Sequence, residues 1–218
     1  MAEVEIRPYR REDWAAVYQI AADTAFIGDP LERYLDNRQI FYDAFYRYYT
    51  ELEPEHGWVA CEGETVVGFL MGCLDTATQR RRLFREILPP VAWRLLTGKY
   101  SVGSRTRSYG WHLLQAALRG EIVHCDLDLY PAHLHLNISA HSRGFGLGRR
   151  LMLVYLDQLG RLGVPGVHLS TTDRNYAACH LYESMGFQAV AAHRTRIWEH
   201  LVEGRVENRI YARRLGRI

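Results

Sequence analysis

The segment Arg143-Gly144-Phe145-Gly146-Leu147-Gly148 decides how this sequence can fold. Glycine occupies every second position between a stretch that alternates like a strand and a stretch with helical periodicity. Glycine lets the backbone turn tightly and approach a ligand, and the start of a helix offers unpaired N–H groups and a positive dipole end to an anion. The segment therefore predicts a strand, a phosphate-binding loop and a helix.

Two other kinds of phosphate loop fit this spacing less well. A dinucleotide-binding turn has Gly-x-Gly-x-x-Gly and an acidic residue about twenty positions later, and a triphosphate loop has Gly-Lys-Ser/Thr. Neither pattern is present. The residues alone leave one other interpretation, a glycine-rich turn that binds nothing.

Strand-like and helix-like segments surround the loop in an order typical of an α/β fold. Strands are expected at 4–7, 58–62, 66–74, 133–139, 166–171, 187–196 and 205–214. Helices are expected at 13–25, from Asp29-Pro30 to about 52, at 149–162 and at 175–185. The second of these helices carries many aromatic residues, which are expected mainly in the core.

The stretch from 75 to 131 interrupts this regular order. It contains two helix-like pieces, at about 80–96 with Pro89-Pro90 as an interruption, and at 108–118. Between 75 and 119 it has nine Lys or Arg, against Asp75 and Glu86 as acids. We interpret it as a mainly helical insertion within a single domain, 1–218. Its basic charge is typical of a solvated helix face and also fits a surface for nucleic acid or acidic lipid. A third interpretation is a cover over an acceptor site that selects an anionic substrate, lined by Trp93, Trp111 and His112.

Composition limits the classes of protein to which the chain can belong. Apolar residues make up 48% of its 218 residues, which allows a large core, and the formal net charge is only +2. No apolar run reaches membrane-spanning length, and the first residues lack a signal-peptide pattern. Four scattered cysteines fit no zinc or disulfide spacing. A cytoplasmic protein that binds neither membrane nor nucleic acid is expected.

Four ordered motifs resemble the GCN5-related N-acetyltransferase (GNAT) superfamily. Arg143-x-x-Gly146-x-Gly148 matches its Arg/Gln-x-x-Gly-x-Gly/Ala signature, and 181–187, Leu-Tyr-Glu-Ser-Met-Gly-Phe, is close to its Leu-Tyr-Glu-x-x-Gly-Phe ending. The segments 6–14 and 66–69 are similar to its opening and its third strand. The resemblance covers about 4–74 and 132–215. It implies a mixed sheet of six to seven strands flanked by helices, with the insertion between strands 3 and 4.

The resemblance also implies acetyl-CoA as cofactor and a set of residues that bind it. Backbone groups of Leu136, Asn137 and Ile138 are expected to pair with the pantetheine arm, and Asn175 to make a polar contact nearby. Backbone amides of the loop and of the next helix are expected to hold the pyrophosphate, and the expected binding residues there are Arg143, Gly144, Phe145, Gly146, Leu147, Gly148 and Arg149.

Tyr182 and His135 are the expected catalytic residues. Tyr182 lies where family members often have the residue that protonates the leaving thiolate, and it is also expected to contact the cofactor. His133, His135 and Asn137 share one strand face, and histidine suits proton removal near neutral pH. The His-x-His pair resembles serotonin N-acetyltransferase, with a spacing to Gly146 that is one residue shorter. The other candidates for the base are Asp126, Asp128, Glu32 and a water relay.

Other chemistries are weaker on the same residues. His133 and His135, with His141 or His124, do not complete a recognised metal spacing, so no metal site is expected. Cys125 and Cys179 have no readable partner base, which favours direct transfer over a covalent intermediate. We expect acetyl transfer to the primary amine of a small molecule, with a homodimer able to form through the last strands. The alternative is a non-catalytic acyl-CoA-binding sensor or partner-binding module.

Overall fold

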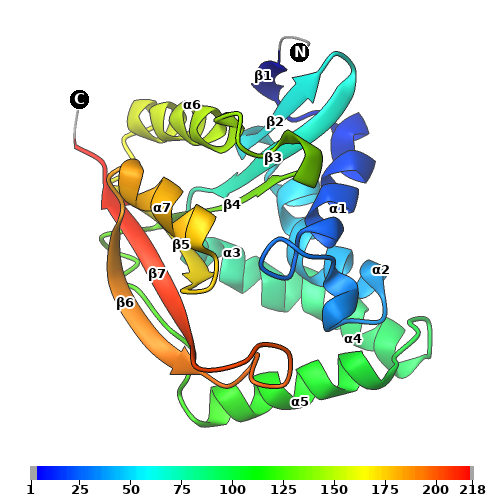
Figure 1. Ribbon diagram of the computed structural model, residues 1–218. Coiled ribbons are helices and arrows are strands. Elements are labelled where there is room, and N and C mark those ends of the chain that lie inside the picture. The colour runs from blue at the N-terminus through cyan, green and yellow to red at the C-terminus, as the bar shows by residue number, and fades with distance from the viewer. Residues whose placement is uncertain (1–3, 217–218) are drawn as a thin grey trace.

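A computed structural model describes residues 4–216 and shows one seven-stranded sheet with helices on both faces (Figure 1). The strand order is β1-β2-β3-β4-β5-β7-β6, and only β4 and β5 pair in parallel. The strands are β1 Val4–Pro8, β2 Gly57–Glu62, β3 Thr65–Cys73, β4 Ala132–Ile138, β5 Gly166–Thr172, β6 Gln188–Thr195 and β7 Val206–Arg214. The expected α/β architecture is confirmed.

The helices lie close to where the periodicity predicts them, with two exceptions described below. They are α1 Trp14–Asp23, α2 Arg38–Phe41, α3 Thr76–Arg82, α4 Leu88–Leu96, α5 Ser104–Leu118, α6 Leu147–Arg161 and α7 Tyr176–Ser184. No helix within residues 4–216 has the length and apolarity needed to cross a membrane.

Two apolar cores lie on opposite faces of the sheet. Alternation along β3 sends Phe69 and Met71 into the core beneath α1, and Leu70 into the core beneath α6. All three side chains are fully buried. On β4 the same alternation sends Leu134 toward α6 and leaves the histidines on the α1 face. The two faces of β4 therefore face different cores.

The parallel pair β4–β5 separates soon after it forms. Only Ala132 and His133 of β4 have partners on β5, namely Val167 and His168. On its other side β4 pairs with β3 as far as Ile138. The remainder of the β4 edge that faces β5 therefore offers unpaired backbone groups, which need a partner from outside the sheet.

The aromatic helix begins later than the sequence predicted. Residues 26–29 form a tight turn in which Phe26 and Asp29 exchange two backbone hydrogen bonds of 2.9 and 2.8 Å. The helix starts at Arg38, where the side chain of Asn37 accepts a hydrogen bond from Ile40 N at 3.1 Å. From there helical backbone, largely of π type, continues to 52. The prediction that the helix starts at Asp29-Pro30 was therefore wrong, because Asp29 closes a turn with Phe26 and does not cap a helix.

The insertion between β3 and β4 is mainly helical, as expected, but its helices begin earlier than predicted. α3 starts at Thr76, capped by Asp75, and α5 starts at Ser104. Pro89-Pro90 do not interrupt the first piece, because a π-helical segment, Leu83–Ile87, leads directly into α4 with the prolines in its first turn. A proline is tolerated in the first turn of a helix because the backbone N–H that it lacks would have no regular hydrogen-bond acceptor there.

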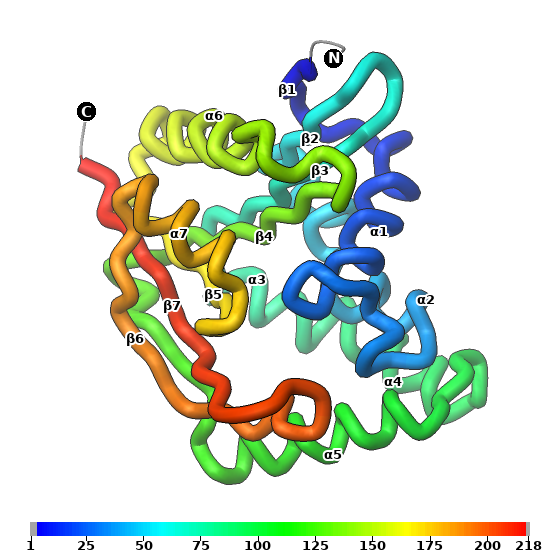
Figure 2. The backbone as a smooth tube through the Cα atoms, in the orientation of Figure 1, coloured from blue at the N-terminus to red at the C-terminus, as the bar shows by residue number. Residues whose placement is uncertain are grey.

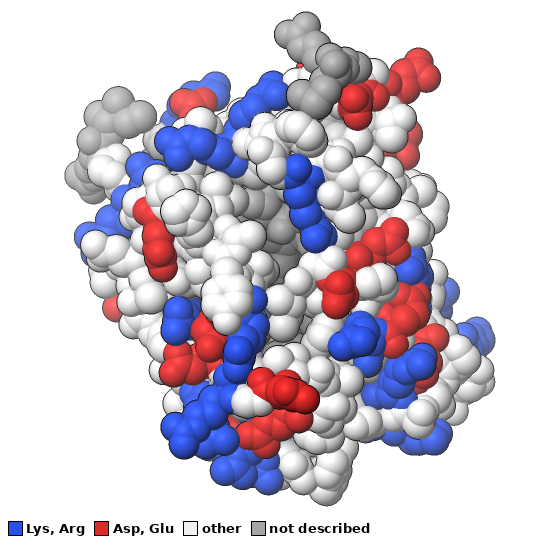
Figure 3. All heavy atoms as spheres, in the orientation of Figure 1, with Lys and Arg blue, Asp and Glu red and all other residues white. Residues whose placement is uncertain are grey.

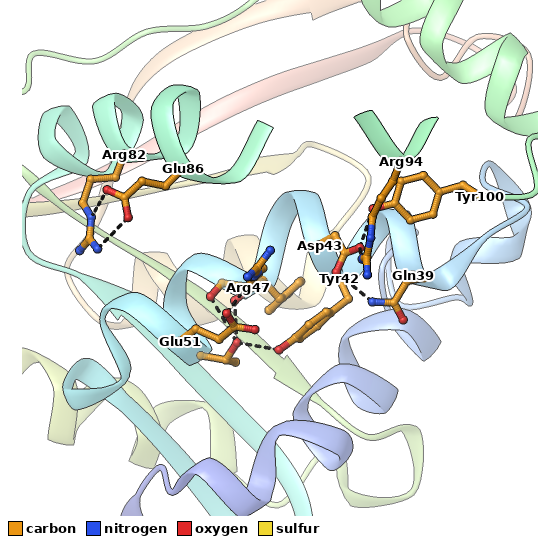
Figure 4. Close-up of polar contacts among 11 residues, drawn as sticks. Gln39, Tyr42, Asp43, Arg47, Glu51, Arg82, Glu86, Arg94 and Tyr100 are labelled. Carbon is orange, nitrogen blue, oxygen red and sulfur yellow. Dashed lines mark hydrogen bonds and ion pairs between the residues drawn. The ribbon is translucent and has the colours of Figure 1, made fainter. Parts of the chain in front are cut away.

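A buried carboxylate anchors the insertion to the aromatic helix. Asp43 is only 4% exposed, and its Oδ2 accepts hydrogen bonds from Arg94 of α4 at 2.7 Å and from Tyr100 at 2.5 Å (Figure 4). Gln39 donates to its Oδ1 at 2.9 Å. Charge-assisted hydrogen bonds of this kind are stronger than neutral ones. The basic insertion is therefore fixed against the domain and not loosely attached to it.

Candidate active site

The glycine loop forms one wall of a cavity of about 370 Å³. Gly146 adopts a left-handed conformation (φ 73°) at the N-terminus of α6, and the first intrahelical bond of that helix is donated by Arg150 N. The preceding amides of the helix have no backbone partner in the described chain. A Cβ on Gly144 or Gly146 would meet open space, whereas one on Gly148 would lie 3.0 Å from the side chain of Leu181. The helix start therefore has both the donors and the space that a phosphate needs.

The unpaired edge of β4 continues the same cavity. Leu136, Asn137 and Ile138 line it opposite residues of α7. An extended ligand with amide groups could hydrogen-bond along this edge in the way that a strand would. The residues thus fit an anionic, extended cofactor, with its phosphates at α6 and its linear arm between β4 and β5.

A second cavity, of about 260 Å³, adjoins the first. The two share six lining residues, which are Thr24, Ile27, Leu136, Asn137, Asn175 and Tyr182. Its other walls include five aromatic side chains, Phe26, Phe41, Phe45, Tyr46 and Trp198, and three residues with hydroxyl groups, Ser170, Thr171 and Thr172. No charged side chain lines it among the described residues. Figure 3 shows a hollow at the centre of the molecule's front face, bordered mainly by residues other than Lys, Arg, Asp and Glu, with one basic side chain along its right-hand border.

Hydrogen bonds fix the side chain of Asn137 where the two cavities meet. Its Oδ1 accepts from Tyr46 Oη at 3.2 Å, and its Nδ2 donates to Thr24 Oγ1 at 2.6 Å. The hydroxyl of Thr24 in turn donates to Ile20 O at 2.7 Å. The amide therefore ties the end of α1 to β4 and holds the boundary between the cavities in place.

Tyr182 also lies at this boundary. It lines both cavities and is 7% exposed, and its hydroxyl makes no hydrogen bond with any described residue. Burial raises the pKa of Tyr182 above its ordinary value. The phenol therefore keeps its proton at neutral pH and can donate it into the cavity.

His133 and His135 lie together on the α1 face of β4, on either side of Tyr49. His133 Nε2 is 2.6 Å from Tyr49 Oη, and His135 Nε2 is 3.0 Å from the same oxygen. Burial, with a smaller contribution from His168, lowers the pKa of His135 to about 4. Burial also lowers the pKa of His133 well below its ordinary value. Both rings are therefore neutral near pH 7, and only His135 lines the aromatic cavity.

The carboxylates considered as alternative bases do not line either cavity. Glu32 forms an ion pair with Arg38 at 2.6 Å. Asp126 accepts backbone hydrogen bonds from Asp128 and Leu129 within its own turn.

Most of the residues expected to bind the cofactor do line the first cavity. The exception is Phe145, whose side chain is 53% exposed and lies outside it. Arg143 lines the cavity, but its guanidinium donates to Gly28 O at 3.0 Å and to Ile138 O at 3.3 Å. Asn175 lines the cavity and also caps α7, because its Oδ1 accepts a hydrogen bond from Ala178 N. Arg143 thus joins the glycine loop to the α1–α2 connection.

The sequence did not reveal the contribution of that connection. Ile27 and Gly28 line the first cavity, and Ile27 has a φ of 53°, which is strained for a β-branched residue. The adjacent pair Ile-Gly before Asp-Pro was the available signal for a turn. Trp93 and Trp111, expected to cover the acceptor site, are 64% and 59% exposed and line neither cavity. His112, the third residue expected there, also lines neither cavity, and its ring stacks on His200 with centroids 4.1 Å apart.

Tyr109 of α5 reaches this region from the insertion. Its ring stacks on Trp198 with centroids 5.5 Å apart and an interplanar angle of 24°. Trp198 lies in the connection between β6 and β7, which runs alongside α5 (Figure 2). The insertion therefore supports a wall of the aromatic cavity through a neighbouring side chain.

Comparison with known proteins gives one family and one fold. The model of the acetyltransferase (GNAT) family matches residues 128–187. A crystal structure named SsHAT has 29% sequence identity, a TM-score of 0.75 and coverage of 98% of this chain and 99% of that one.

Two less similar structures share the fold. The ribosomal-protein-S18-alanine N-acetyltransferase from Escherichia coli is 18% identical with a TM-score of 0.54, covering 98% of this chain and 95% of its own. YncA from Salmonella typhimurium, a putative acetyltransferase with its cofactor acetyl-CoA, is 18% identical with a TM-score of 0.55, covering 99% and 95%. These two matches show the fold alone. The match of the GNAT family model, together with the glycine loop at the start of α6 and the separated β4–β5 pair, shows that the chain belongs to the GNAT acetyltransferase superfamily.

Proposed function

We propose that this chain is an acetyl-CoA-dependent N-acetyltransferase whose acceptor is the primary amine of a small molecule with an aromatic or other apolar group. Membership of the superfamily supports the general activity, N-acetyl transfer, and the cofactor, acetyl-CoA. The observation that supports the finer proposal is the meeting of two cavities, one at the glycine loop and one lined by aromatic side chains.

The first cavity suits the binding of acetyl-CoA, which when bound supplies the acetyl group as a thioester. The amides of Leu147, Gly148 and Arg149, with the positive end of the α6 dipole, would hold the phosphates. The free edge of β4 would hold the linear arm. These backbone contacts would position the reacting carbon, and none of them requires a side chain to take part in the reaction.

Tyr182 and His135, which both line the second cavity, are the proposed proton donor and proton acceptor. Tyr182 Oη holds a proton that it can give to a leaving group in the cavity. His135 is neutral and can take a proton from the acceptor amine, although its lowered pKa makes it a weak base in the free protein. The aromatic, uncharged walls favour an amine bound in its neutral form, which reduces the demand on the base.

A small acceptor suits the second cavity, because its volume is only about 260 Å³ and it lies between the aromatic helix, β4, β5 and the connections that contain Ile27 and Trp198. A peptide N-terminus is the competing acceptor, since protein acetyltransferases share the fold. The uncharged lining argues against acceptors with a second charge near the amine.

Two measurements test the proposal in sequence. Acetyl-CoA at saturation should raise the melting temperature, because a ligand that binds only the native state stabilises it. Acetyl transfer should then be measured on a matched panel of aromatic amines, polar diamines and N-terminal peptides. Turnover confined to peptides would refute the small-molecule acceptor, and stabilisation by acetyl-CoA with no turnover would indicate a binding module.

A further inference from the structure

A chain of hydrogen bonds behind His135 fixes the position of each hydrogen along it. It begins at the carbonyl oxygen of Pro131, which can only accept, and the hydroxyl of Thr76 lies 2.7 Å from it. Thr76 therefore donates its single hydrogen to Pro131 O. His133 Nδ1 lies 2.6 Å from Thr76 Oγ1. Because that hydroxyl has no second hydrogen to give, Nδ1 of His133 must carry a hydrogen and donate it.

The next link assigns the hydrogen of Tyr49. Burial keeps His133 neutral by lowering its pKa, so its single ring hydrogen is the one on Nδ1 and its Nε2 is a bare acceptor. Tyr49 is 3% exposed, and burial raises its pKa, so the phenol is protonated. Its Oη lies 2.6 Å from His133 Nε2 and must donate to it.

The last link assigns the tautomer of His135. Tyr49 has given its hydrogen to His133, so its oxygen can only accept from His135 Nε2, 3.0 Å away. A neutral His135 has one ring hydrogen, and that hydrogen is therefore on Nε2. Nδ1 of His135 is left with a free lone pair, makes no hydrogen bond within the described chain and is not completely buried.

We infer that Tyr49, oriented by His133 and Thr76, is a positioning residue that holds His135 in the tautomer whose Nδ1 accepts the proton of the acceptor amine. The inference rests on the proposed function of His135. The amine is bound neutral, and its nitrogen becomes cationic only as it bonds to the acetyl carbon. An N–H bond of that nitrogen then breaks, its electron pair stays on the nitrogen, and the proton moves to Nδ1. The resulting imidazolium still donates from Nε2 to Tyr49, so the hydrogen bond is kept and becomes charge-assisted.

Among the groups around His135, Tyr49 is the one that orients its ring. The aromatic helix contributes Tyr46 and Tyr49, whose ring centroids lie 5.8 and 5.0 Å from that of His135. β4 contributes His133, and β5 contributes His168, whose Nδ1 is bound to Tyr130 O. A third cavity behind His135 also has Arg80 of α3 on its wall. No carboxylate lines this cavity or the aromatic one among the described residues, so no acid takes the orienting role.

Tyr49→Phe tests the inference, because it removes both hydrogen bonds and keeps the ring. The kcat of the variant should fall at least about tenfold, and its KM for acetyl-CoA should be unchanged. A tenfold loss is a part of the rate enhancement that a general acid or base contributes. The acidic limb of the plot of kcat against pH should also shift. Tyr48→Phe is the matched control, since the neighbouring Tyr48 bonds Glu53 and not the histidines. Equal kcat values and profiles for Tyr49→Phe and the wild type would overturn the inference.

A spectroscopic measurement keeps the test independent of turnover and of how well the variant folds. Long-range ¹H–¹⁵N spectra of the wild-type protein at pH 7 should show His135 with hydrogen on Nε2 and His133 with hydrogen on Nδ1. The opposite tautomer at His135 overturns the inference, even if the enzyme is active. Absence of turnover on every amine, with the expected tautomers present, counts against the proposed function and leaves the hydrogen-bond assignment standing.

Discussion

Acidification from pH 7 to pH 5 should destabilise this protein through His135. Its pKa of about 4 in the folded chain lies below the ordinary value of about 6.5 that it regains on unfolding. The unfolded chain therefore binds more protons in this range, and stability falls as the pH falls from about 6.5 toward 4. The lost free energy of unfolding is about 2 kcal/mol at pH 5 and about 3 kcal/mol at pH 4 for this residue alone.

The assay is urea denaturation of the wild type and of His135→Gln at pH 7 and pH 5. Glutamine does not titrate, and its amide nitrogen can keep a bond to Tyr49. The variant should lose about 2 kcal/mol less than the wild type between the two pH values. Stopping at pH 5 keeps the carboxylates ionised. His180→Gln, at an exposed histidine of α7, is the control. The same pH dependence in the wild type and His135→Gln would refute the reasoning.

Two further substitutions separate cofactor binding from chemistry. Gly148→Val places a branched side chain against Leu181, 3.0 Å from the new Cβ, so acetyl-CoA affinity by calorimetry should fall at least about tenfold, which is about 1.4 kcal/mol. Gly110→Val, in open space on α5, should leave that affinity unchanged, and equal affinities for both variants would contradict the assigned loop. Tyr182→Phe should lower kcat about 100-fold and leave acetyl-CoA affinity intact, and an unchanged kcat would exclude a proton role.

The sequence predicted the parts of this fold that depend on local patterns. Alternation located the strands, and the glycines before Arg149 located the helix start and its anion site, because both signals lie within a few neighbouring residues. The late start of the aromatic helix was missed because Asp29-Pro30 also fits the end of a turn. A local pattern with two structural meanings is resolved only by the contacts of the folded chain.

The acceptor side of the site could not be predicted in this way. Tyr49 meets His133 from 84 positions away, and Asn137 meets Thr24 from 113 positions away. The separation of β4 from β5 is an absence of pairing, which leaves no residue pattern in either strand. The His-x-His pattern showed that two histidines share a face, but only the tertiary contacts show which one reaches a cavity.

The insertion gives a last test of how the acceptor wall is supported. Trp198 lines the aromatic cavity, and Tyr109 of α5 stacks against the Trp198 ring. Tyr34 contacts both rings, with centroids 4.9 and 5.3 Å away. An aromatic pair contributes about 0.5–1.5 kcal/mol beyond its buried area. Tyr109→Ala should therefore loosen Trp198 and raise the KM for the amine several-fold, with acetyl-CoA affinity unchanged because the first cavity has no wall from the insertion.

Trp111→Ala provides the matched control for this substitution. Trp111 is on the same helix, is of similar bulk and is 59% exposed, and it lines neither cavity. Its removal should leave the KM for the amine at the wild-type value. If both variants raise that KM equally, the helix acts through its overall stability. If neither does, Trp198 keeps its position without the insertion, and the wall is built by the β6–β7 connection alone.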